Sequence, residues 1–178
     1  MKAVFLDRDG TVNVGVPVYE RVDSISKVIL LPGTIEALKL LGGLDYGVFF
    51  VTNQAGISEG LINLKEFEQI NNKVLELISP SGITILKTYI CPHAENDNCN
   101  CRKPQPTLLL QAAKEFNIDL ASSWMIGDRP SDVLTGVNAG TKTILTKTGV
   151  PTVESKFATL TTPSLLEAAQ YIHVHIAP

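Results

Sequence analysis

The sequence has little of what marks secreted, membrane-bound or disulfide-stapled proteins. Its 178 residues include three cysteines, all between positions 91 and 101, and an odd number cannot form an even disulfide framework. No apolar run approaches the roughly 20 residues of a membrane span, and the short run "AVFL" near the N-terminus is too brief for a signal peptide. We therefore expect a cytoplasmic protein with no membrane partner.

An excess of positive charge is also missing. Eighteen acidic residues stand against fifteen basic ones, with no long run of like charge. Surfaces that hold nucleic acid or anionic membranes carry clustered lysine and arginine, so neither partner is expected. Glycine-rich phosphate loops of the Walker or dinucleotide type are absent, which leaves nucleotide-driven chemistry without support. A small substrate is the better expectation.

The chain has the composition and pattern of one packed domain, at 44% hydrophobic and 19% charged residues, with no linker. We expect a monomer with a single domain over residues 1–178. Strand and helix patterns alternate, which predicts a doubly wound, mostly parallel α/β sheet with helices on both faces. The expected strands are Ala3–Leu6, Tyr46–Val51, Ile83–Ile90, Trp124–Ile126 and Thr143–Leu145, and the expected helices are Ile35–Leu41, Leu64–Ile78, Thr107–Phe116, Ser131–Ala139 and Ser164–Tyr171.

Two aspartates follow the first apolar run, in the string "VFLDRDGTVN". Residues i and i+2 of an extended chain face the same way, so Asp7 and Asp9 should point into one cleft while Arg8 points elsewhere. Carboxylates this close repel unless a cation neutralises them or one carries a proton, and Mg²⁺ suits such oxygen ligands. Asp128, at the fourth strand end, would complete the site, with Asp132 as support.

Two other interpretations of these aspartates are weaker. A hairpin turn at "DG" would leave them solvated, but hairpin strands prefer alternating flanks, whereas "AVFL" is continuous, as in a strand buried on both faces. A calcium loop of the helix-loop-helix type needs glycine at its sixth position, and Gly10 is at the fourth. The pattern therefore favours a metal and catalytic site.

The string "VTNQAG" lies at the expected end of the second strand. Thr52 offers a hydroxyl and Asn53 and Gln54 offer amides, groups that suit phosphate oxygens and bound substrate. Simple turn chemistry is the alternative, since such residues are common where strands end.

The string "CPHAENDNCNCRKP" contains four soft ligands within eleven residues: Cys91, His93, Cys99 and Cys101. This set is sufficient for a closed, structural Zn²⁺ site, which would order a polar loop that cannot pack by itself. A casual cysteine cluster, or an oxidised pair with a spare thiol, is the alternative.

Arg102 and Lys103 follow the last of these cysteines directly. A fixed pair of cations at the sheet edge would neutralise phosphate charge, whereas the bland alternative is a solvated basic pair. Further along, "YIHVHIAP" alternates like a strand. Its His173 and His175 are read as surface or core residues, with a two-histidine metal site as the alternative.

Four strings, "FLDRDGTVN", "VTNQAG", "CRKP" and "MIGDRPSD", resemble in order the four motifs of the haloacid dehalogenase superfamily of phosphohydrolases, across about residues 3–146. The cysteine and histidine loop resembles the subgroup of heptose-bisphosphate and histidinol-phosphate phosphatases. Superfamily members often carry a cap domain after the first or second motif. Both gaps are too short for a large cap here, so the zinc loop at 91–103 and the loop at 14–30 should supply specificity.

The resemblance implies a role for each residue. Asp7 would be the nucleophile that forms an aspartyl phosphate, and Asp9 would protonate the leaving alcohol and then activate water. Thr52 and Lys103 would hold the transferring phosphoryl group. Asp128, with Asp7 and the backbone carbonyl of Asp9, would hold the catalytic Mg²⁺.

The resemblance also implies a small phosphorylated metabolite as substrate, with Arg102 and Arg129 recognising the part away from the reacting phosphate. Removal of the 7-phosphate from D-glycero-D-manno-heptose 1,7-bisphosphate is the favoured activity, and histidinol-phosphate hydrolysis is the alternative. In "GISEG", Glu59 stands where heptose phosphatases usually carry a basic residue, a departure that bears on recognition of a second phosphate. A nucleic-acid 3′-phosphatase and a non-catalytic zinc-binding interaction module are the alternatives from other classes.

Overall fold

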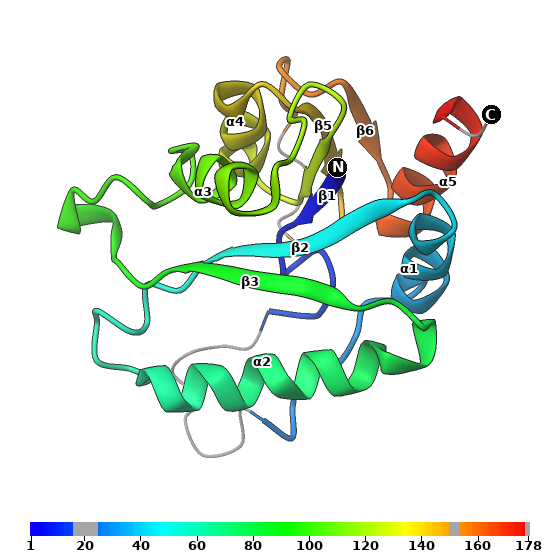
Figure 1. Ribbon diagram of the computed structural model, residues 1–178. Helices are drawn as coiled ribbons and strands as arrows, with labels where there is room; N and C mark the ends of the chain where they lie inside the picture. The colour runs from blue at the N-terminus through cyan, green and yellow to red at the C-terminus, as the bar shows by residue number, and fades with distance from the viewer. Residues whose placement is uncertain (16–24, 150–153, 177–178) are drawn as a thin grey trace.

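A six-stranded parallel sheet forms the centre of the protein, seen in a computed structural model that describes residues 1–15, 25–149 and 154–176 (Figure 1). The strand order is β3-β2-β1-β4-β5-β6, so the chain winds outward from β1 in both directions, and the prediction of a doubly wound sheet is confirmed. The strands are β1 Lys2–Leu6, β2 Tyr46–Asn53, β3 Ile85–Cys91, β4 Trp124–Gly127, β5 Lys142–Thr146 and β6 Leu160–Thr162.

Helices cover both faces of the sheet, as expected. Helices α1, α2 and α5 pack on one face, and α3 and α4 lie on the other (Figure 1). The helices are α1 Thr34–Gly42, α2 Leu64–Ile78, α3 Thr107–Phe116, α4 Pro130–Ala139 and α5 Leu165–Ile176. Short 3₁₀ turns follow at η1 Ser79–Ser81 and η2 Glu95–Asp97. Among the described helices, none has the length and apolar character needed to cross a bilayer.

The first strand explains why the sequence "AVFL" shows no alternation. Val4 and Leu6 pack toward α1, α2 and α5, while Ala3 and Phe5 pack toward α3 on the opposite face, and all four are fully buried. A strand covered by helices on both sides needs apolar residues at every position. The same strand therefore places Asp7, its next residue, at the carboxyl edge between two hydrophobic layers.

The structure differs from the sequence predictions near the C-terminus. Strand β6 was not expected, since its three residues contain a single apolar side chain and it gains its order from pairing with β5. The interpretation of "YIHVHI" as strand-like is wrong: this segment continues α5, and His173 and His175 are exposed. Of the metal-ligand clusters found among the described residues, neither includes these two histidines.

The connections that follow β1 and β2 are compact where they are described. Residues 54–63 form turns without a helix or strand, in agreement with the expected lack of a large cap. Of the predicted specificity loop at 14–30, positions 16–24 lie outside the described residues. The described end of that loop is tied to the first motif, because Asn13 forms a bridge with Leu30.

Candidate active site

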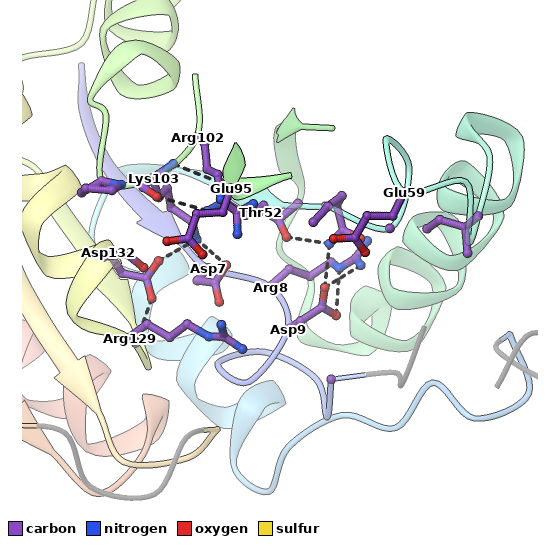
Figure 2. Close-up of a pocket in the computed structure, with 18 of the residues that line it drawn as sticks. Asp7, Arg8, Asp9, Thr52, Glu59, Glu95, Arg102, Lys103, Arg129 and Asp132 are labelled. Atoms are coloured by element: carbon purple, nitrogen blue, oxygen red, sulfur yellow. Dashed lines mark hydrogen bonds and ion pairs between the residues drawn. The ribbon is translucent and has the colours of Figure 1, made fainter. Parts of the chain in front are cut away.

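A cavity of about 510 Å³ opens at the carboxyl edge of the sheet (Figure 2). Side chains from all the motif strings line it, including Asp7, Asp9, Thr52, Lys103 and Arg129. The strands that carry these motifs are neighbours in the sheet, so segments far apart in sequence meet at one edge.

Three buried carboxylates cluster at this edge of the sheet, and two of them, Asp7 and Asp132, line the cavity. One oxygen each from Asp7, Asp128 and Asp132 lies within 4.8 Å of the others. Asp132, expected only as support, is thus a full member of the cluster. Asp128 can approach the turn after β1 because residue 10 is glycine. Gly10 has a φ of +95°, and a Cβ at this position would lie 2.7 Å from Asp128 Oδ2, which leaves no room for a side chain. The fold therefore brings three acidic side chains together where they are almost completely buried from solvent.

Lys103 is the cation that faces this cluster. Its Nζ lies 2.5 Å from Asp7 Oδ1 and 2.6 Å from Asp132 Oδ1, and it donates to the carbonyl of Val51 at 2.9 Å. The lysine is only 5% exposed. The loop after β3 thus places this cation at the sheet edge, beside the carboxylate cluster.

The charges in the cluster shift one another. Burial raises the pKa of Asp7 well above its usual range. The charge of Lys103 lowers this pKa, and the charge of Asp132 raises it further. Burial also raises the pKa of Asp128, and Asp132 adds to the rise. Burial favours the neutral form of Lys103, but the two carboxylates outweigh it and raise its pKa. The cluster holds more negative charge than one ammonium neutralises, which makes it a fitting site for a hard cation.

Asn53 makes contacts within the protein that were not predicted. Its Oδ1 accepts from the backbone N–H of Lys103 at 3.1 Å, and its Nδ2 donates to the carbonyl of Lys103 at 3.3 Å. Asn53 lines the cavity, but its amide is occupied in fixing the backbone that carries the lysine. Its contact with substrate stays a prediction, and its partner in the protein, 50 residues later, could not be identified from the sequence.

Asp9 lies across the cavity from the carboxylate cluster, as Figure 2 shows. Its oxygens accept from Arg8 Nη2 at 2.8 Å and Nε at 3.3 Å, from Asn13 Nδ2 at 2.9 Å and from Gln54 Nε2 at 2.7 Å. Burial alone would raise the pKa of Asp9, but the charge and hydrogen bonds of Arg8, with help from the two amides, hold it below its usual value.

Arg8 contradicts the prediction that it would point away from the cleft. It lines the same cavity as Asp7 and Asp9 and is 2% exposed. The two-residue alternation of a strand ends here, because the chain turns at once: the Arg8 carbonyl accepts from the N–H groups of Val12 and Asn13 at 2.9 and 3.1 Å. Sequence reasoning missed both Arg8 and Asn13, although they stand inside the motif string.

Gln54 joins the two halves of the site. Its Nε2 donates to Asp9 Oδ2 and also to Thr52 Oγ1, the latter at 2.8 Å. Thr52 is 1% exposed and lines the cavity from the end of β2. Gln54 therefore links the groups on either side of it, and its predicted contact with substrate stays a prediction.

The outer wall of the cavity mixes both signs of charge. Arg102 and Arg129 line it, as do the exposed carboxylates of Glu59 and Glu95. Arg102 also donates to the carbonyl of His93 at 3.0 Å, and the Arg129 side chain is 63% exposed. Glu95, which had no predicted role, lies in the short 3₁₀ turn after β3, and Figure 2 shows its side chain among those that line the cavity.

The four soft ligands beside the cavity gather as the spacing predicts. The His93 Nδ1 lies 3.3 Å from Cys101 Sγ and 3.6 Å from Cys91 Sγ, and the sulfur pairs lie 3.1 to 3.7 Å apart. Zn–S bonds of about 2.3 Å arranged tetrahedrally place sulfurs about 3.8 Å apart, so one ion would fit with small adjustments. Arg102 and Lys103 follow this cluster immediately.

Comparison with known proteins gives consistent results. The family model described as HAD-hydrolase-like matches residues 100–171. The chain is 43% identical over 142 residues to a D-glycero-beta-D-manno-heptose-1,7-bisphosphate 7-phosphatase of Helicobacter pylori. The matched region covers 79% of this chain and 80% of that relative. It is 40% identical over 160 residues to the enzyme of the same name from Pasteurella multocida, with 86% and 85% covered.

A solved structure agrees with these relatives. The D,D-heptose 1,7-bisphosphate phosphatase of B. bronchiseptica, crystallised with magnesium and phosphate, superposes with a TM-score of 0.88 at 28% identity and covers 98% of this chain and 99% of that one. Sequence identity at this level over most of both chains shows common descent. The chain belongs to the haloacid dehalogenase-like hydrolases, in the family of the heptose-1,7-bisphosphate 7-phosphatases.

Proposed function

We propose that this phosphatase removes the 7-phosphate of D-glycero-β-D-manno-heptose 1,7-bisphosphate in a Mg²⁺-dependent reaction. The observation that carries the proposal is a buried group of three carboxylates and one ammonium beside the cavity, in a chain similar to relatives named for this activity. The group consists of Asp7, Asp128, Asp132 and Lys103. The group offers a nucleophile, oxygen ligands and a fixed cation within a few ångströms, as phosphoryl transfer requires.

The oxygen donors of the cluster fit Mg²⁺. Asp7 and Asp128, with the backbone carbonyl of Asp9, would hold it, and Asp132 keeps Lys103 in place beside them. When bound, the ion would offset the repulsion between carboxylates and phosphate. The surplus of buried negative charge supports this assignment.

The residues divide the reaction into two balanced steps. An oxygen of Asp7 attacks phosphorus, the bond to the sugar oxygen breaks, and that oxygen takes a proton from Asp9. Water then attacks the phosphoryl group and passes a proton to Asp9, and the bond to Asp7 breaks to release inorganic phosphate. The lowered pKa of Asp9 keeps its carboxylate ionised, as the second step requires, and the charge of the arriving phosphate would favour the proton needed for the first.

The other residues hold the substrate. Lys103 and the Thr52 hydroxyl would bind the transferring phosphoryl oxygens at the cavity floor. At the outer wall, Arg102 and Arg129 would bind the rest of the sugar phosphate. Carboxylates such as Glu59 would accept hydrogen bonds from sugar hydroxyls.

One observation favours a second candidate. Glu59 and Glu95 each place an exposed carboxylate in the cavity wall, and a carboxylate suits an ammonium group as well as it suits hydroxyls. An amino-alcohol phosphate such as histidinol phosphate carries that group. The similarity to the named relatives supports the heptose substrate. The carboxylates in the cavity wall make histidinol phosphate the alternative substrate.

The test is Mg²⁺-dependent phosphate release from a panel: the heptose 1,7-bisphosphate, histidinol phosphate and a 3′-phosphorylated oligonucleotide. We expect selective turnover of the heptose compound. Faster release from histidinol phosphate would favour the second candidate. Salt-sensitive release from the oligonucleotide would indicate a nucleic-acid phosphatase. No release from any of them would overturn the substrate assignment and call for a wider set of sugar and amino-alcohol phosphates.

We also propose that Cys91, His93, Cys99 and Cys101 hold a structural Zn²⁺. Their mutual distances fit one ion, and protein ligands would fill all its positions, leaving no site for a reactive water. The loop has little core of its own, so the metal would supply its order.

Replacing His93 with asparagine should therefore lower the zinc content below one ion per chain and lower the melting temperature by several degrees. Metal analysis and thermal unfolding measure both. His173→Asn, a change at an exposed histidine on α5, is the matched control and should alter neither. Full zinc content in His93→Asn would count against the assignment.

A further inference from the structure

The hydrogen-bond capacity of Asp9 is completely used. Oδ1 accepts from Arg8 Nε and Asn13 Nδ2, and Oδ2 accepts from Arg8 Nη2 and Gln54 Nε2. A carboxylate offers about four lone-pair sites, so each is occupied. The Asp9 side chain is still 26% exposed and lines the cavity, so this clamp presents the carboxyl to the substrate space.

Arg8 is the part of the clamp that is hardest to explain by stability. Its side chain is 3% exposed, and its guanidinium lies 5.0 Å from the ring centroid of Phe67 on α2. Within the described part of the chain, its buried Nη1 has no hydrogen-bond partner. A buried charged group with an unused donor costs folding free energy, and such exceptions call for a functional explanation.

We propose that Arg8 is a positioning residue, which holds the Asp9 carboxyl toward the leaving group. This inference rests on the proposed function and deepens it. When Asp9 takes up a proton, one of its four hydrogen bonds must open, because that oxygen becomes a donor. The two-point contact of Arg8 survives the loss of any single bond, and Phe67 fixes the plane of the guanidinium. Orientation is thereby kept while the proton moves.

A positioning role of Arg8 can be distinguished from a merely structural role by comparing substrates with different leaving groups. A sugar alkoxide is a poor leaving group and needs the proton of Asp9 when its bond to phosphorus breaks. A p-nitrophenolate leaves without a proton, so the first step with p-nitrophenyl phosphate needs only Asp7 and the groups that hold the phosphoryl. A residue that acts through Asp9 should therefore matter for the first substrate and not for the second.

The experiment compares Arg8→Met and Arg8→Lys with the wild type, using Mg²⁺-loaded protein. We expect Arg8→Met to lose about 10²-fold in kcat on the heptose bisphosphate, with a smaller change in KM, because acid–base catalysis contributes at least that much. The rapid first-turnover release of p-nitrophenol should stay near the wild-type rate. Arg8→Lys, which keeps the charge and one donor, should recover part of the loss.

Two comparisons complete the test. Adding Arg8→Met to Asp9→Asn should cost nothing further on the heptose substrate, since both act at one proton transfer. Arg129→Met, which removes a cavity arginine at the outer wall, should raise KM for the heptose bisphosphate, whose distal part it would bind, whereas Arg8→Met should lower kcat. If Arg8→Met unfolds, circular dichroism will show it, and Arg8→Lys then carries the comparison.

Equal loss on both substrates, or additive losses in the double variant, would overturn the positioning role while leaving the proposed phosphatase intact. Absence of Mg²⁺-dependent turnover by the wild type would instead overturn the proposed function, and the role of Arg8 with it.

Discussion

Replacing Asp7 with asparagine is expected to reduce phosphate release by at least about 10⁴-fold, the scale seen when a covalent nucleophile is removed. The amide cannot attack phosphorus, and it also gives up the ion pair with Lys103 and one oxygen of the carboxylate cluster. Phosphate release from the heptose bisphosphate with saturating Mg²⁺ measures the effect, and the fold should persist because the side chains have nearly the same shape.

Asp45→Asn is the matched control for this change. Asp45 is exposed at the opposite end of the sheet, and its φ of 56° is one that asparagine adopts readily. The Asp45→Asn variant should release phosphate at the wild-type rate. Asp7→Asn protein that keeps a measurable fraction of the activity would show that the nucleophile lies elsewhere.

The part of the site that could be predicted from sequence is the part fixed by topology. A continuous apolar run identified β1 as a strand buried on both faces, and parallel order then placed Asp7, Thr52, Lys103 and Asp128 at one edge. Close spacing along the chain gave the cysteine and histidine cluster in the same way. Neither conclusion needed a side-chain conformation.

The part that could not be predicted is set by side chains meeting across the fold. The turn after β1 brings Arg8 onto Asp9, where strand alternation would have sent it away. Asn53 meets the backbone of Lys103, and Lys103 meets Asp132, through contacts that no local pattern records. Likewise α5 continues past Tyr171 because the buried residues of its helical face, such as Ile172, outweigh a local alternation that resembles a strand.

Replacing Lys103 with methionine is expected to lower phosphate turnover by about 10³-fold, as loss of a buried group that stabilises the transition state does. In the absence of Mg²⁺ it should also lower the free energy of unfolding at pH 7 by about 3–5 kcal/mol, because Asp7 and Asp132 lose their buried partner. Turnover assays and urea denaturation measure the two effects.

The pH and metal dependence of this variant follow from the same cluster. Asp7 already has a raised pKa when folded, and without Lys103 that pKa should rise further, so the folded state will bind more protons than the unfolded chain. The deficit in stability should therefore shrink as the pH falls below the folded pKa and grow as the pH rises through it.

Mg²⁺ should stabilise Lys103→Met more than the wild type, since the cation would no longer compete with an ammonium on Asp7. Lys87→Met, which removes a partly exposed lysine paired with Glu115 at the surface, should show neither dependence. A Lys103→Met protein whose stability ignores both pH and Mg²⁺ would mean that the three carboxylates do not act as one charged site.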